Sequence, residues 1–103
     1  MAFQLTVLYN HPEDPEKFDE HYDNVHAPLA ARMPGLRSYT VSRPVPRGHE
    51  KPPYHLVAIL TFDDEAAFQA AMASEIGQQA VADLANFAQA GATSMIGPVD
   101  TVA

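Results

Sequence analysis

The sequence of 103 residues is long enough for one domain, and its composition excludes several classes of protein. Acidic residues outnumber basic ones 13 to 6, and the resulting charge of −7 disfavours binding to nucleic acid or to an anionic membrane surface. Cysteine is absent, which excludes disulfides and thiolate metal sites. No stretch has the roughly 18 apolar residues of a membrane helix and no signal segment is recognisable, so a cytoplasmic protein is expected, with residues 1–103 forming a single domain.

The first part of the chain predicts a strand followed by an amphipathic helix. Residues 3–10 alternate apolar and polar side chains, the period of a strand. Asp14 and Pro15 are typical of the cap and first position of a helix. An apolar stripe at helical spacing then follows, formed by Phe18, Tyr22, Val25 and Leu29. Pro28 cannot donate a backbone hydrogen bond, so we expect this helix to kink or loosen around His26.

The rest of the chain predicts two strands, two helices and a last strand. Residues 36–43 and 54–62 predict two further strands, separated by a loop at 44–53 that contains four prolines. Asp63 or Asp64 is expected to cap the helix that follows these strands, which carries Phe68 and Met72 on one face. A second helix is expected to start at Ser74, with a core stripe formed by Ile76, Ala80, Leu84 and Phe87. A last strand is predicted at residues 91–99.

The order β-α-β-β-α-β predicts an α+β, ferredoxin-like fold, an antiparallel four-stranded sheet with its helices on one face. The strand at 54–62 is apolar on both faces, whereas the helices can cover only one face of the sheet. A second copy packing sheet to sheet would cover the other face, so we expect a homodimer, a dimeric α+β barrel.

Three segments carry the most specific motifs of the chain: the "F…HY…VHAPL" helix, the "PGL" turn, and the segment from Tyr54 to Phe68. In these segments, and over essentially its whole length, the chain resembles the EthD family, the ethyl tert-butyl ether degradation protein family of the dimeric α+β barrel superfamily. The founding member is encoded beside a cytochrome P450 system for ether degradation. The resemblance implies a role in xenobiotic catabolism or secondary metabolism, and related barrels include isomerases, cyclases and monooxygenases. The resemblance therefore specifies the fold more closely than it specifies the reaction.

His26 is the first candidate for catalysis, as an acid or base. It lies four residues after Tyr22, on the same helix face, and three after Asp23, which could orient the imidazole. In related isomerases and cyclases, similar His and Tyr side chains transfer protons. The alternative is a structural histidine that caps carbonyls freed by Pro28.

Six further residues complete the candidate site. Tyr22 and Tyr39 could donate hydrogen bonds to a carbonyl or enolate oxygen, and His55 is a further candidate base. Structural alternatives are a half-buried strand tyrosine and a solvated strand-end histidine. The expected substrate contacts are Asp23, Leu29 and Tyr9.

No metal and no cofactor is expected from the sequence. His21 and His26 are five residues apart, roughly 140° around an α-helix, which should keep them from sharing one metal ion. There is no Gly-rich nucleotide loop either.

The leading hypothesis is a protein that binds a small, hydrophobic, oxygenated molecule between its first helix and the sheet and acts as a cofactor-independent isomerase or cyclase. One alternative is a non-catalytic accessory or carrier protein for a neighbouring P450-type oxygenase. Another is a small monooxygenase, either cofactorless or linked to haem.

Overall fold

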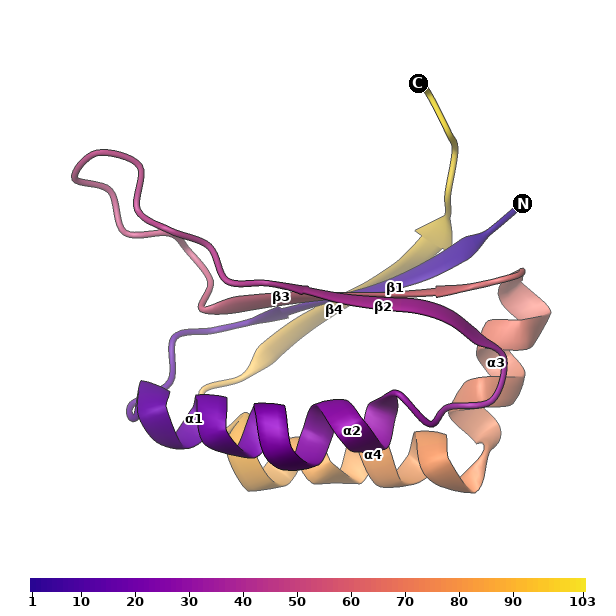
Figure 1. Cartoon of the computed structure of the whole chain (residues 1–103), viewed down its shortest axis with the longest axis horizontal. Helices are drawn as coiled ribbons and strands as arrows, with labels where there is room; N and C mark the ends of the chain where they lie inside the picture. The colour runs from indigo at the N-terminus through magenta and orange to yellow at the C-terminus, as the bar shows by residue number, and fades with distance from the viewer.

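The structure, a computed structural model that describes residues 1–103, is a four-stranded sheet with all helices on one face (Figure 1). The strands are β1 (Phe3–Tyr9), β2 (Leu36–Ser42), β3 (Leu56–Phe62) and β4 (Ala92–Pro98). The helices are α1 (Pro15–His21), the π turn η1 (Tyr22–His26), α2 (Ala27–Ala30), α3 (Glu65–Ala73) and α4 (Glu75–Phe87). Neighbouring strands are antiparallel in the order β2-β3-β1-β4, which confirms the predicted ferredoxin-like α+β fold.

Side-chain caps fix where three of the helices begin. Asp14, Asp64 and Ser74 accept hydrogen bonds from backbone amides three residues further on, at 3.1, 2.8 and 3.0 Å. Ser74 also ends α3, so the second helical region is split in two, as predicted. Gly77 allows this tight corner, because a Cβ at that position would overlap the carbonyl oxygen of Ala71.

The two faces of the sheet differ in what covers them. Along β3 the side chains that face the helices are fully or nearly fully buried, and those between them are half-buried. The largest fully buried side chains of the core are Tyr9, Tyr22, Phe62 and Leu56. On the opposite face, which we call the open face, Val57 pairs in register with Leu8 and Ile59 with Thr6. The open face therefore carries apolar side chains that no element of the chain covers.

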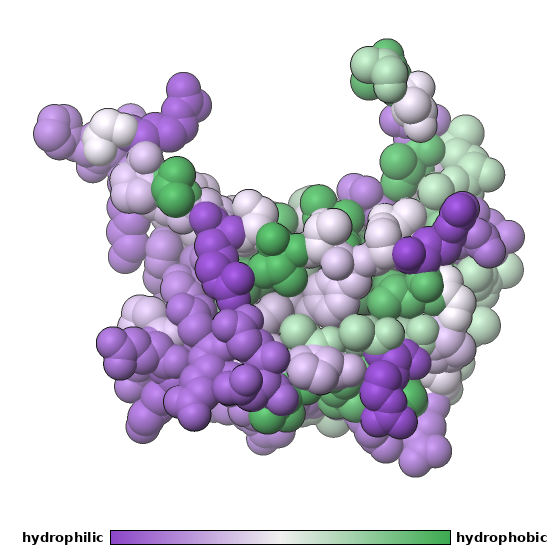
Figure 2. Space-filling model, viewed as in Figure 1, coloured by the Kyte–Doolittle hydropathy of each residue, from purple (hydrophilic) through white to green (hydrophobic).

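Two projections flank the open face. The segment 43–55, between β2 and β3, and the C-terminal residues 99–103 both extend away from the helices (Figure 1). Figure 2 shows them on either side of a broad hollow. Each carries an exposed apolar side chain, Val45 and Val102. None of the helices is both long and apolar enough to span a membrane.

Candidate functional site

The helix that runs from α1 to α2 contains a π turn where Pro28 interrupts the α-helical pattern. The amide of Ala27 donates to the carbonyl of Tyr22, five residues back, and Pro28 has no N–H to donate. This confirms the expected loosening around His26. It also corrects the predicted apolar stripe: His26 is buried, with 6% of its surface exposed, whereas Val25 is 46% exposed.

The π turn brings His21 and His26 to one carboxylate. His21 Nε2 lies 2.9 and 3.0 Å from the two carboxylate oxygens of Asp83, and His26 Nδ1 lies 3.0 Å from Asp83 Oδ2. The expected angle of roughly 140° between the two imidazoles was wrong, because it assumed α-helical geometry throughout. In a turn closed by bonds from residue i to i+5, side chains five apart can point the same way.

Asp83 is the hub of this cluster and is almost completely buried on α4. Burial by itself raises the pKa of its carboxyl group, but hydrogen bonds from Asn86, His21 and His26 outweigh that effect and hold the pKa below its usual value. The Asn86 amide donates to Asp83 Oδ1 at 2.9 Å. Asp83 is therefore ionised at neutral pH and can only accept hydrogen bonds.

For His26, burial is the largest influence on the pKa. Desolvation lowers the pKa of its imidazole, and the hydrogen bond and the charge of Asp83 offset this only in part. His26 is therefore neutral at pH 7, and one of its two ring nitrogens carries a lone pair.

An inner cavity of about 230 Å³ lies between the helices and the sheet. Fourteen of its 16 lining residues are hydrophobic, and none is a lysine, arginine, aspartate or glutamate. Its polar groups come from side chains on β1, η1, β2 and β4, namely Tyr9, Tyr22, His26, Tyr39 and Ser94. The cavity is thus apolar and uncharged, with a few polar groups that could orient a ligand.

The phenols of the inner cavity form a buried pair. The hydroxyls of Tyr22 and Tyr39 lie 2.5 Å apart. Burial raises the pKa of both phenols, and either hydroxyl can be the donor in the hydrogen bond between them. Burial also raises the pKa of Tyr9. All three phenols are therefore neutral and can act only as hydrogen-bonding groups.

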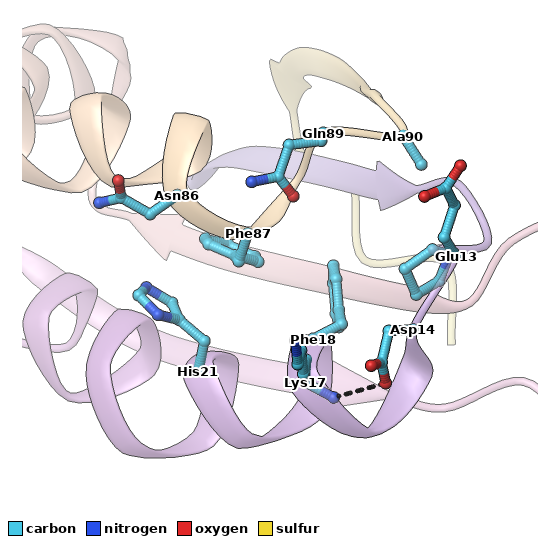
Figure 3. Close-up of a pocket in the computed structure, with 10 residues that line it drawn as sticks. Glu13, Asp14, Lys17, Phe18, His21, Asn86, Phe87, Gln89 and Ala90 are labelled. Atoms are coloured by element: carbon cyan, nitrogen blue, oxygen red, sulfur yellow. Dashed lines mark hydrogen bonds between the residues drawn. The ribbon is translucent and has the colours of Figure 1, made fainter.

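A second, outer cleft of about 600 Å³ lies between the start of α1 and the end of α4. Figure 3 shows Lys17, Phe18 and His21 from the first helix facing Asn86 and Phe87 from α4 across this cleft. The cleft is larger than the inner cavity but mostly polar.

The ring of Phe87 contacts one histidine from each of the two hollows. The Phe87 ring centroid lies 5.1 Å from that of His21, which lines the outer cleft, and 4.7 Å from that of His26, which lines the inner cavity. The Asp83 cluster thus reaches both hollows.

Four of the seven predicted site residues line the inner cavity: Tyr9, Tyr22, His26 and Tyr39. The other three do not. Asp23 is exposed and pairs with Arg43 at 2.7 Å instead of orienting His26. His55 Nε2 lies 2.8 Å from Asp19, and its ring packs edge-on against Phe18, outside the cavity. Leu29 is half-buried and packs against the core.

Sequence reasoning missed Asp83 and Asn86. Asp83 lies three residues after Ala80 and four before Phe87, on the core stripe that was predicted for this helix. A carboxylate in a core stripe needs buried hydrogen-bond donors, and that position was the available signal. No group of three or more His, Asp or Glu side chains is arranged so that it could hold a metal ion.

The free energy of unfolding should fall as the pH is lowered from about 7 to about 5. The pKa of the His26 imidazole is lowered in the folded protein. Below the ordinary histidine pKa of 6.5, His26 is therefore protonated in the unfolded chain while it is still neutral in the folded chain, and this difference favours unfolding. The free energy of unfolding is thus highest above pH 6.5 and decreases as the pH falls towards the pKa of His26 in the folded protein. Asp83 adds a loss of stability of the same sign only below the ordinary pKa of its carboxyl group, 3.8.

Urea unfolding at about pH 7, 6 and 5 measures this effect. The variant His26→Gln keeps an N–H donor for Asp83 but does not titrate, so its stability should depend less on pH in this window. A wild-type protein that becomes more stable towards pH 5 would show that the Asp83 pairing outweighs the burial of His26.

The fold and the apolar inner cavity define a ferredoxin-like α+β protein with room for a small ligand. The EthD domain model matches residues 10–91, and the chain belongs to the EthD family. An ethyl tert-butyl ether degradation (EthD) family protein from Bacillus halodurans is 38% identical, with a TM-score of 0.91 over 97% of this chain and 100% of that one.

Two further comparisons extend this result. The uncharacterized 11.0 kDa protein in the thcB-thcC intergenic region of Rhodococcus erythropolis is 37% identical over 100 residues, which is 97% of each chain. SnoaB from Streptomyces nogalater, a cofactor-independent oxygenase, is 20% identical with a TM-score of 0.68, covering 98% of this chain and 95% of that chain. At this identity the similarity to SnoaB shows a shared fold alone.

Proposed function

We propose that this protein binds a small, neutral, mainly apolar oxygenated compound in the inner cavity and catalyses a cofactor-independent proton transfer on it. The observation that carries the proposal is the position of His26 Nε2. This atom has no hydrogen-bond partner in the chain, yet no side-chain nitrogen or oxygen is both buried and unpaired, so Nε2 keeps accessible surface on a ring that lines the inner cavity. A neutral imidazole placed in this way can act as a base.

The properties of the cavity support the substrate class. Its volume of about 230 Å³ is below the range of roughly 300–1,000 Å³ that is typical of pockets for drug-sized ligands. No cation lines it, and the nearest buried charge is the anionic Asp83, so a carboxylate would lose its hydration without gaining a counter-charge. A neutral ketone, phenol or lactone would not carry this cost.

The proposed reaction uses three side chains. His26 Nε2 takes a proton from a carbon next to a carbonyl group, and the electron pair of the C–H bond moves to form an enolate. With Tyr22 as the donor within the hydrogen-bonded tyrosine pair, the Tyr39 hydroxyl donates its own proton as a hydrogen bond to the enolate oxygen. In a substrate with a double bond between its β- and γ-carbons, the enolate is a dienolate. The imidazolium of His26 then returns the proton to the γ-carbon and the double bond moves to the α,β-position, so the net reaction is an isomerisation and needs no oxidant.

Deuterium exchange into a model ketone tests this proposal. We use 2-tetralone, a neutral two-ring ketone, and follow deuteration of its α-carbon in D₂O by NMR, with binding measured by calorimetry. The wild-type protein should accelerate exchange, and His26→Gln should reduce the acceleration by roughly 100-fold or more while binding changes little. His49→Ala, in the exposed segment 43–55, is the matched control and should behave as wild type.

The other results of this assay separate the alternative functions. If the wild type bound 2-tetralone without accelerating its exchange, the proposed catalysis would be overturned. That result would favour a carrier protein for a neighbouring oxygenase. Oxygen uptake with a quinol would favour a monooxygenase. Binding of 2-naphthoate more tightly than 2-naphthol would contradict the neutral substrate class.

We also propose a cytoplasmic homodimer that serves ether degradation or a related catabolic or secondary pathway. The uncovered apolar side chains of the open face support the dimer, and the ether-degradation name of the Bacillus halodurans relative supports the setting. Proteins with the same fold and lower identity include dimeric ferredoxin-like proteins from Thermobifida fusca and Jannaschia.

A further inference from the structure

We infer that Asp83 is a positioning residue that fixes His26 as the Nδ1–H tautomer, which leaves the Nε2 lone pair directed at the inner cavity, and that His21 holds Asp83 in place from the side of the outer cleft. The catalytic consequence rests on the proposed function. The tautomer can be measured without any substrate.

The first step is the direction of the hydrogen bond between His26 and Asp83. An ionised carboxylate has no proton to donate, so at 3.0 Å the proton between Nδ1 and Oδ2 belongs to the imidazole. In a neutral imidazole the other nitrogen then carries no proton. Nε2 is therefore a hydrogen-bond acceptor and a base in the cavity, and it cannot act as a donor until it has taken up a proton.

The second step is how the carboxylate itself is held. Asp83 Oδ1 accepts from Asn86 and from His21, and Oδ2 accepts from His26 and from His21. His21 therefore spans both oxygens. Its side chain is 26% exposed, compared with 8% for that of Asp83, so it closes the solvent side of the carboxylate. With donors on both oxygens, the carboxylate has a single orientation towards His26.

The third step is the charge that forms during proton transfer. When His26 takes up a proton at Nε2, the imidazolium that results lies 3.0 Å from the Asp83 carboxylate, in a site where burial otherwise penalises the cation. Asp83 thus stabilises the protonated base without touching the substrate. A neutral residue of the same shape would supply neither the tautomer nor the charge.

The test is the ¹⁵N NMR spectrum of the histidine rings at about pH 7.5, with His26 identified from its loss in His26→Gln. The wild type should show a protonated Nδ1 and a bare Nε2. Asp83→Asn should shift His26 towards the Nε2–H form and reduce 2-tetralone exchange by roughly 100-fold or more. Asp83→Glu should restore the Nδ1–H tautomer in part. Asn86→Ala, which removes a different donor to the same carboxylate, should leave the tautomer unchanged.

The outcomes separate this inference from the proposed function. A wild-type His26 that carries its proton on Nε2 overturns the positioning role, whatever the exchange assay shows. So does an Asp83→Asn protein that keeps the wild-type tautomer. An Nδ1–H tautomer without any exchange of 2-tetralone overturns the proposed reaction and leaves the role of Asp83 intact. If Asp83→Asn does not fold, the wild-type and Asp83→Glu spectra still decide the question.

Discussion

Replacing Leu56 with aspartate should unfold the protein. Leu56 has no exposed surface and lies opposite Tyr9 in the sheet, in the row that faces the helices. A carboxylate there would have no partner, and burying an unpaired charge costs several kcal/mol or more. This is comparable to the total stability of about 5–15 kcal/mol that is typical of a domain. Circular dichroism and urea unfolding at neutral pH measure the loss.

The matched substitution Leu56→Ala separates charge from lost packing. It should cost about 2–5 kcal/mol, the range for a large core side chain, and leave a folded protein where Leu56→Asp does not. A Leu56→Asp protein with a melting temperature close to that of the wild type would contradict the burial of this row against the helices.

Replacing the next residue, Val57, should instead separate two subunits that each stay folded. Val57 is half-buried and points to the open face, where the proposed homodimer packs sheet to sheet. In a monomer the new carboxylate would remain in water, whereas in the dimer it would be buried against a second apolar sheet. Sedimentation should give the monomer mass of 11.2 kDa for Val57→Asp and twice that mass for the wild type at micromolar concentration.

Val25→Asp is the matched control for the dimer. Val25 lies on η1, on the helical side of the molecule, and is 46% exposed. The same change of residue there should leave the dimer intact. A wild-type protein that sediments as a monomer across the micromolar range, or a Val57→Asp protein that remains a dimer, would contradict the proposed assembly.

The fold was predictable because its signals are local. The alternation of β1 and the caps at Asp14 and Ser74 depend on neighbouring residues, and strands of a β-α-β-β-α-β order have few ways to pair. The apolar residues on both faces of β3 also indicated, from the sequence alone, that one face of the sheet lacks a cover within the chain. These features need no knowledge of contacts between distant segments.

The candidate site was predictable only in part, because it depends on geometry that the sequence does not display. Pro28 indicated a disturbed helix, but not that the disturbance is a π turn, and so it was not apparent that His21 and His26 face the same way. Asp83 is 57 residues away from His26 and meets it only through the packing of α4 on η1. Asp23, the nearest acid in sequence, pairs with Arg43 instead.

The π turn also has a consequence for chain length. A turn of this kind is equivalent to one extra residue inserted into an α-helix whose two ends stay in place. A homologue that lacked one residue between Tyr22 and His26 could therefore keep the cap at Asp14, the final turn of α2 and the packing on the sheet. Its two imidazoles would then lie four residues apart on a regular α-helix and would still share one face. A single deletion could thus remove the π turn during evolution without exchanging any residue that takes part in the shared carboxylate contact, and without breaking that contact.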